Sequence, residues 1–147
     1  MSKHIGIVAC SAEGAALCYR TICSEAPAVM DEHMHPEISM HTHPLGVYMP
    51  HIRSGNWNEV AKLMLSSAVK LSNVGAELLI CPDNTIHEAF DLVIKEYPVK
   101  WIHIAEAVAE EAEQNGYNNL GITGTKYLVT GPVYSQILKK HNINFQV

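Results

Sequence analysis

Polar residues follow three short apolar runs of the sequence, and together they could bind a small acid. Residues 10–14 (CSAEG) come after the first run, residues 81–87 (CPDNTIH) after the second and residues 123–126 (TGTK) after the third. Hydroxyl, amide and carboxylate groups of this kind can hold a carboxylate or move a proton. Where such a segment also begins a helix, its free backbone N–H groups favour an anion such as a carboxylate or a phosphate.

Each segment also fits an ordinary structural role when it is considered alone. Ser11, Asn84 or Thr85 could cap a helix through its side-chain oxygen. Glu13 could be a solvated carboxylate in a first helical turn, and residues 124–125 could form a plain turn. The occurrence of all three segments after strands of one sheet is what favours a shared site.

Short apolar strands alternate with helical segments along the chain. We expect strands at residues 4–10, 37–42, 77–81, 99–103, 120–123 and 143–147, and helices at residues 13–24, 56–74, 85–95, 104–115 and 134–141. This alternation is typical of βαβ units, and it predicts an α/β fold with a parallel sheet flanked by helices. Ligands of such sheets bind beyond the carboxyl ends of the strands, where the three polar segments lie.

Composition and charge exclude several classes of protein. The 147 residues suffice for a domain with a real core, and the formal net charge of −5 argues against a nucleic-acid partner. No apolar run approaches the ~20 residues of a membrane span. Glu13 and Arg20 interrupt the first apolar run, so the opening residues do not fit a signal peptide. We therefore expect a cytoplasmic protein without membrane partners.

Cysteines and histidines are the candidate metal ligands. The four cysteines (Cys10, Cys18, Cys23 and Cys81) are too scattered for a disulfide framework or a zinc ribbon, and we expect free thiols. Two HxH pairs occur at residues 33–35 and 41–43. His41 and His43 would project from one face of a strand, as zinc ligands can, but no further ligand stands at a clear spacing. We predict no metal, and we expect His43 at the mouth of the pocket, where it could pair with a substrate carboxylate.

Three blocks of the sequence resemble the aspartate/glutamate racemase family. Residues 6–20 (GIVACSAEGAALCYR) are similar to the family's G-I-[IL]-G-G-M-S-P-E-[AS]-T…Y-[YF]-R start, shortened by one residue. Residues 81–91 (CPDNTIHEAFD) are similar to its [IP]-[PC]-C-N-T-x-H motif, and residues 120–147 to its G-T-x-x-T-x-x-S-G-x-Y segment. The blocks occur in the family's order and span nearly the whole chain.

The resemblance implies a pair of α/β domains with the active site in the cleft between them. We expect the first domain over residues 1–116 and the start of a second over residues 117–147. The chain ends at the close of a strand, little past halfway along the resembling proteins. The strand at its end and its length relative to these proteins both favour the N-terminal portion of a racemase-like protein, truncated before the second domain is complete. The resemblance also implies a homodimer.

The implied activity is racemisation of aspartate, glutamate or a related amino acid without a cofactor. In the family two bases, usually cysteines, act on opposite faces of Cα. Asp83 stands where the first cysteine is expected, so Asp83 is the implied catalytic residue, and the second cysteine motif is absent. A free thiol has a pKa of ~8.5 and a free Asp carboxyl ~3.9, which makes the carboxylate the weaker base by about 6 kcal/mol. Burial against apolar walls could recover part of this difference.

Substrate-binding residues are implied by the same three blocks. They are Ser11, Glu13, Asn84, Thr85, Thr125, Thr130 and Gly131, with Thr130 in place of the family's Ser. Asn84 and Thr85 would bind the α-carboxylate. Cys10, His43 and His87 are further candidates, and Cys10 occupies a position where the family has a small residue. Residues 43–48 lack the arginine with which many members bind a side-chain carboxylate, so specificity for an acidic amino acid stays open.

Two alternatives to a racemase remain at this point. The first is a relative that only binds a small carboxylic acid, or that performs one-sided proton chemistry such as isomerisation or decarboxylation; the aspartate at position 83 favours it. The second is a metal-binding module built on the HxH pairs.

Overall fold

A four-stranded parallel sheet forms the first part of the computed structural model, which describes residues 3–97 and 99–147. Its strands are β1 (Ile5–Ala9), β2 (Ile38–Thr42), β3 (Leu78–Ile80) and β4 (Trp101–Ile102), in the order β2-β1-β3-β4. Ile5 of β1 is paired with Ile38 on one side and with Leu78 on the other. The carboxyl ends of β1 and β3 therefore lie side by side.

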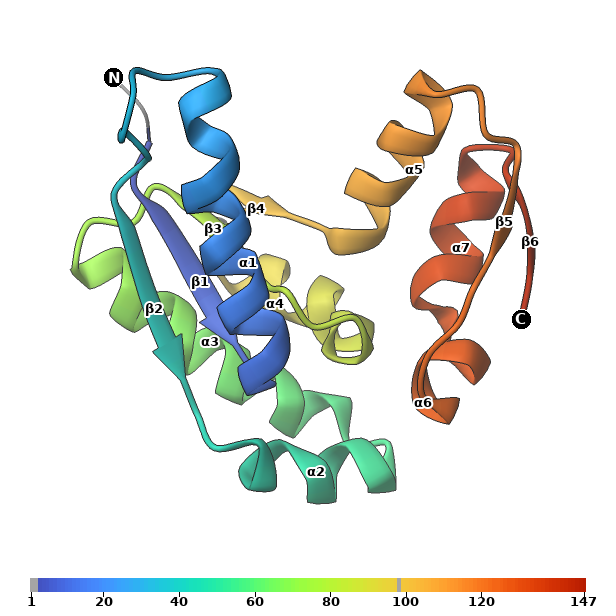
Figure 1. Cartoon of the computed structure of the whole chain (residues 1–147). Helices are drawn as coiled ribbons and strands as arrows, with labels where there is room; N and C mark the ends of the chain where they lie inside the picture. Colours follow the sequence, from blue (N-terminus) through green and yellow to red (C-terminus); the bar gives the residue numbers. More distant parts are fainter. Residues whose placement is uncertain (1–2, 98) are drawn as a thin grey trace.

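Helices cover both faces of this sheet (Figure 1). On one face lies α1 (Ala12–Glu25), followed by the short 3₁₀ helix η1 (Ala26–Ala28). On the other face lie α3 (Trp57–Asn73) and α4 (Phe90–Glu96), with α2 (Leu45–Ser54) packed against α3 and the 3₁₀ helix η2 (Thr85–Ala89) leading into α4.

The helix expected over residues 56–74 is confirmed as α3, and apolar residues at a 3.6-residue period form a stripe along it. Val60, Met64 and Leu71 are buried on the side that packs against β1. The Asn56 side chain caps the helix by accepting from the Glu59 N–H at 3.4 Å. The stripe therefore supplies the largest part of the core beneath the first sheet.

A second, smaller group of elements follows β4 and lies beside the first (Figure 1). It consists of α5 (Ile104–Gln114), α6 (Lys126–Thr130), α7 (Pro132–Lys140) and a parallel pair of strands, β5 (Asn119–Gly121) and β6 (Asn144–Gln146). Ala109 and Ala112 of α5 pack with Leu138 and Ile143 in a core of their own. The α/β fold with parallel sheets is thus confirmed. A domain boundary after residue 116 stays a prediction, and α5 shares the core of the later elements.

Several elements differ from those expected. Helix α2 was not expected, because Gly46 and Pro50 lie within it, and neither was the five-residue α6. The helix expected over residues 85–95 divides into η2 and α4, and β4 is shorter than residues 99–103. Pro44 precedes α2 and Gly55 ends it with a φ of +66°, a left-handed conformation that glycine adopts without strain.

None of the helices in the described part of the chain combines the length and the apolar character that crossing a bilayer requires.

Candidate functional site

A polar cavity of about 400 Å³ lies where the two groups of elements meet. Its polar lining comes from the segments after β1, β3 and β5: Cys10, Ser11, Asp83, Asn84, Thr85, Thr123, Gly124 and Thr125. Its apolar lining comes from α2 and α6: Leu45, Met49, Ile52, Tyr127 and Leu128. The three polar segments singled out in the sequence therefore share one cavity. The expectation that all three follow strands of one sheet was wrong, because β5 belongs to the separate two-stranded sheet.

The polar side chains of this cavity are not used as helix caps. Ser11, Asn84 and Thr125 each precede a helix, yet the side chain of none of them accepts a capping hydrogen bond. The hydroxyls of Ser11 and Thr125 and the Nδ2 group of Asn84 are consequently available to a ligand. This geometry favours the functional interpretation of these residues over the capping one.

Gly14 allows α1 to approach the segment that carries Asp83. A Cβ atom at this position would overlap the carbonyl oxygen of Pro82 and would lie 3.0 Å from the Ser11 hydroxyl oxygen. Only a residue without a side chain fits there. The glycine thus brings the N-terminus of α1 against the loop that follows β3.

Asp83 is the one carboxylate among the residues that line the polar cavity. Cys10 is buried beside it, and burial, the charge of Asp83 and a hydrogen bond to the Asp83 side chain all raise the pKa of the Cys10 thiol. Burial, and then the charge of Asp83, likewise raise the pKa of Cys81, which lies behind the cavity wall. Both thiols are therefore protonated at neutral pH, and neither is a ready base.

His87 holds the Asp83 loop in place from behind the cavity. The residue is buried, and its Nδ1 lies 2.8 Å from the Asp83 carbonyl oxygen. Its Nε2 accepts from the backbone N–H of Ile104 at 3.2 Å, so the proton of the neutral ring is on Nδ1, which donates to Asp83. Burial lowers the pKa of His87 to about 4. His87 thus joins the Asp83 loop to the start of α5 without lining the polar cavity.

Tyr134 contacts the site through Asn84. Its hydroxyl donates to Asn84 Oδ1 at 2.6 Å, across a separation of 50 residues in the chain. Sequence reasoning did not select Tyr134, although it belongs to the third block. Thr123 belongs to the third polar segment but was not among the predicted binding residues. The α2 residues were missed because α2 itself was not expected.

Besides His87, four predicted site residues lie outside the lining of the polar cavity. Glu13 is exposed on α1, and the Thr130 hydroxyl donates to the Lys126 carbonyl oxygen at 2.7 Å within α6. A Cβ atom at Gly131 would lie 2.7 Å from the Tyr127 carbonyl oxygen, which points to a packing role. His43 lies near α3, with Nε2 3.3 Å from the Ser66 hydroxyl oxygen. A part for these four in substrate binding stays a prediction.

The HxH pair at residues 41–43 belongs to a polar network between β2 and α3. The Lys70 ammonium group donates to His41 Nε2 at 3.1 Å, and His41 Nδ1 lies 2.9 Å from the Ser67 hydroxyl oxygen. Burial, followed by the charge of Lys70, lowers the pKa of both histidines. Across residues 3–97 and 99–147, no three His, Cys, Asp or Glu side chains are grouped as metal ligands.

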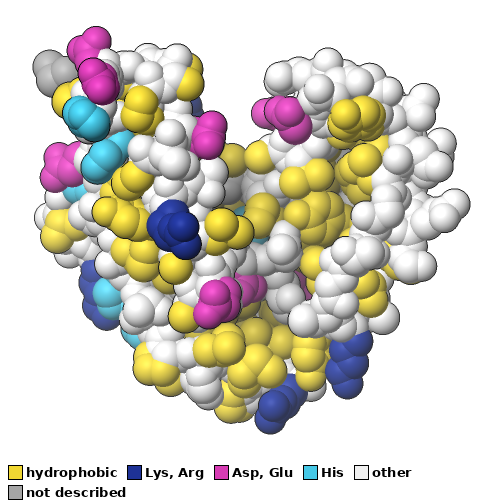
Figure 2. All heavy atoms as spheres, in the orientation of Figure 1, with side chains coloured by type: hydrophobic (Ala, Val, Ile, Leu, Met, Phe, Trp, Pro, Cys, Tyr) yellow, Lys and Arg dark blue, Asp and Glu magenta, His cyan; other side chains and the backbone are white. Residues whose placement is uncertain are grey.

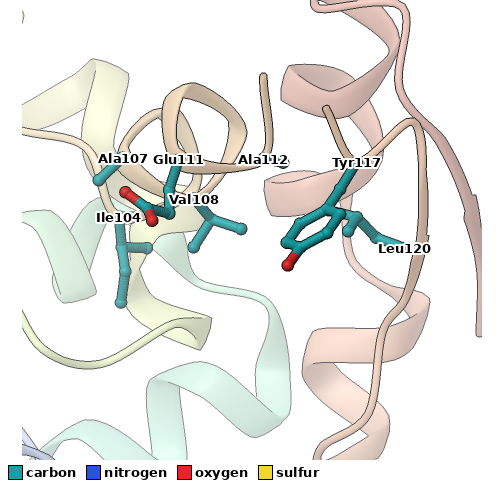
Figure 3. Close-up of a pocket in the computed structure, with 7 residues that line it drawn as sticks. All are labelled: Ile104, Ala107, Val108, Glu111, Ala112, Tyr117 and Leu120. Carbon is teal, nitrogen blue, oxygen red and sulfur yellow. The ribbon is translucent and has the colours of Figure 1, made fainter. Parts of the chain in front are cut away.

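A second cavity of about 430 Å³, the apolar groove, lies between α5 and the residues that lead into β5. It is lined by Ile104, Ala107, Val108, Glu111, Ala112, Tyr117 and Leu120, and the α5 side chains face Tyr117 and Leu120 across it (Figure 3). Figure 2 shows hydrophobic side chains along the notch between the two groups of elements. The apolar groove is slightly larger than the polar cavity, yet it lacks hydroxyl, amide and carboxylate groups converging on one point, so the polar cavity is the candidate active site.

Comparison with known proteins identifies the family of the chain. The family model described as Asp/Glu/Hydantoin racemase matches residues 5–147. The chain belongs to this family. A relative of the racemase-family chain is the broad specificity amino-acid racemase RacX of Bacillus subtilis, 22% identical over 117 residues, which cover 80% of this chain and 50% of RacX.

Solved structures of racemase-family proteins have the same fold. The crystal structure of an Asp/Glu racemase from Yersinia pestis matches with a TM-score of 0.89 at 25% identity, over 99% of this chain and 64% of that one. An aspartate racemase homologue from Pyrococcus horikoshii matches with a TM-score of 0.85 at 26% identity, over 99% and 64% of the two chains. The chain thus spans half the length of RacX and under two thirds of these structures.

Proposed function

We propose that this racemase-family chain binds an amino acid in the polar cavity and that Asp83 accepts the proton from Cα, without a cofactor. The observation that carries the proposal is the position of Asp83 in one cavity with Ser11, Asn84, Thr85 and Thr125. Membership of the family and the relation to an amino-acid racemase support it.

The side chains around Asp83 suit the α-carboxylate of an amino acid. The Asn84 amide and the hydroxyls of Ser11 and Thr85 are hydrogen-bond donors in the cavity, and the N-terminus of the 14-residue helix α1 adds unpaired backbone N–H groups. Removal of the Cα proton moves negative charge onto the carboxylate oxygens. Donors already in place stabilise that charge, and this lowers the barrier to deprotonation.

The apolar side of the cavity would strengthen Asp83 as a base. Leu45, Met49 and Leu128 line the cavity opposite the polar segments. A bound substrate would exclude water between these side chains and the carboxylate. Loss of water disfavours the charged form of a carboxylate and so makes it a better proton acceptor. This effect offsets part of the disadvantage of an aspartate relative to a thiolate.

The same lining bears on the choice of substrate. The residues described as lining the polar cavity include no lysine or arginine. Five of the lining residues from α2 and α6 are apolar or aromatic. A side-chain carboxylate would find no cation there, and an apolar side chain would find matching surface. We therefore propose a substrate with an uncharged side chain in preference to aspartate or glutamate.

A second candidate function is one-sided proton chemistry, such as isomerisation or decarboxylation of a small carboxylic acid. It is favoured by the chemistry of the lining, where Asp83 is the one carboxylate and the neighbouring Cys10 thiol is held in its protonated form. Racemisation needs a second group on the opposite face of Cα. The homodimer and the cytoplasmic location stay predictions from the sequence.

Proton exchange at Cα in D₂O tests the proposal and separates the two candidates. Dialysed protein, without added pyridoxal phosphate, is incubated with L-alanine, L-methionine, L-aspartate and L-glutamate. Proton NMR follows the α-signal and chiral chromatography follows the product. Exchange with inversion supports a racemase, and exchange with retention supports one-sided chemistry by Asp83. Absence of exchange with every probe would contradict both.

A further inference from the structure

Asn84 forms part of the wall between two cavities. It lines the polar cavity, and it also lines a smaller cavity of about 210 Å³ together with Tyr134. Tyr134 lines the smaller cavity and not the polar one. The tyrosine is therefore placed to act on a ligand of the polar cavity only through Asn84.

The hydrogen bond between the two residues determines which end of the Asn84 amide is free. Tyr134 donates to Oδ1 at 2.6 Å, and this occupies the accepting end of the amide. The Nδ2 group, with two N–H donors, remains for another partner. An ionised carboxylate only accepts hydrogen bonds, so it needs this orientation and would be repelled by the opposite one.

Tyr134 is a dependable donor in this place. Burial raises the pKa of its phenol, so the hydroxyl keeps its proton throughout the neutral and mildly alkaline range. The residue comes from α7, whereas Asn84 follows β3 of the first sheet. The contact thus joins the second group of elements to the loop that carries Asp83.

We infer that Tyr134 is a positioning residue, whose hydroxyl holds the Asn84 amide with its N–H groups available to the α-carboxylate of the substrate. The inference deepens the proposed function and rests on it. The ring of Tyr134 also packs on the core formed by α5, α7 and β6. Substitution by phenylalanine keeps this packing and removes the hydroxyl alone.

A double-mutant cycle on ligand binding tests the inference. Dissociation constants for L-alanine, L-methionine and L-aspartate are measured by NMR titration for the unmodified protein, Tyr134→Phe, Asn84→Ala and the double variant. We expect Tyr134→Phe to raise the dissociation constant about tenfold in the unmodified background and less than twofold in the Asn84→Ala background, because the hydroxyl acts through Asn84. Tyr117→Phe, which changes an exposed tyrosine of the apolar groove, is the matched control and should leave binding unchanged.

Two results of the cycle would overturn the inference: an unchanged dissociation constant in Tyr134→Phe, or the same increase in both backgrounds. A second readout does not need a ligand. The side-chain amide signals of Asn84 in the ¹H–¹⁵N spectrum should shift in Tyr134→Phe and stay in place in Tyr117→Phe. If the unmodified protein binds none of the probes, the proposed function fails, whereas unshifted Asn84 signals would refute the positioning by Tyr134 itself.

Discussion

The polar cavity and the apolar groove are nearly equal in volume, about 400 and about 430 Å³, yet only the polar cavity is lined by several hydroxyl and amide groups beside a carboxylate. The polar cavity is lined by the segments that follow β1, β3 and β5, whereas the groove is lined by α5, by Tyr117 before β5 and by Leu120 within β5. Thr123 and Tyr117 thus lie beyond opposite ends of the same short strand.

Volume alone therefore does not locate a site in this fold. Turns after parallel strands expose polar groups and backbone N–H groups at the carboxyl ends of the strands, independently of where apolar surfaces occur. The groove presents the α5 face with Val108 exposed and with one carboxylate, Glu111, opposite the partly buried Leu120 of β5. Substitutions that separate these two regions are the sharpest tests of the assignment.

The largest expected effect is the loss of proton exchange on substitution of Asp83. Asp83→Asn keeps the size of the side chain and removes the base, so we expect Cα exchange in D₂O to slow by about 1,000-fold, within the range typical of a general base. Glu111→Gln makes the same chemical change in the apolar groove and should leave the rate unaltered. Equal effects of the two variants would remove the distinction between the regions.

The next effect concerns the dependence of stability on pH. Because the pKa of His87 falls from 6.5 to about 4 on folding, the unfolded chain binds more protons between these values. The contribution of His87 to the free energy of unfolding should therefore be largest above pH 6.5 and decrease, by up to about 3 kcal/mol, as the pH falls to 4. Urea unfolding at several pH values measures this change, and His87→Gln should show a flatter profile. A profile as steep in the variant as in the unmodified protein would contradict the buried neutral imidazole.

A smaller loss of stability is expected for Gly14→Ala. The added Cβ would meet the Pro82 carbonyl oxygen and separate α1 from the Asp83 loop, at a cost of about 1–3 kcal/mol. Gly46→Ala is the matched control, because a Cβ at Gly46 has no neighbour within 4 Å. Alanine in α2 should be neutral or slightly stabilising. Urea unfolding of both variants decides the point, and a Gly14→Ala protein as stable as the control would rule out the close approach.

The smallest effect is expected for His141, in the second group of elements. Its two ring nitrogens lie 2.9 Å from a Glu113 oxygen and 2.6 Å from a Glu106 oxygen, and these carboxylates raise the pKa of the ring. The stabilisation is complete below pH 6.5 and is lost as the pH rises through the raised pKa, opposite in sign to the effect of His87. His141→Gln should lower the melting temperature slightly at pH 6 and not at pH 9. A loss of equal size at both pH values would mean that the charge of His141 contributes nothing.

The polar cavity was in large part predictable from the sequence. Ser11, Asp83, Asn84 and Thr85 come after β1 and β3 of the first sheet, so their position beyond the carboxyl ends of these strands follows from strand direction. Thr125 comes after β5 of the second sheet, so its place in the same cavity depends on how the two groups of elements pack. The stripe of α3 was predictable because its 3.6-residue period extends over several turns.

The remaining features depend on contacts that are distant in sequence. The hydrogen bond from Tyr134 to Asn84 spans 50 residues, and no local pattern reports it. Helix α2 contains Gly46 and Pro50, which oppose a helix locally, and it is packed against α3. The sequence did not show that Glu13 lies outside the cavity lining, because the direction of a side chain at a helix start depends on how the helix packs on the sheet: Ser11 lines the cavity, whereas Glu13 is exposed.

The measurement that tests the central claim most directly is the location of ligand binding by NMR. ¹⁵N-labelled protein is titrated with L-alanine and L-methionine while all backbone amide signals are followed. We expect the signals of residues 10–12, 83–85 and 123–125 to shift together with a single dissociation constant, and those of residues 107–117 to stay in place. Shifts confined to residues 104–120 would place the ligand in the apolar groove and contradict the assignment of the polar cavity as the active site.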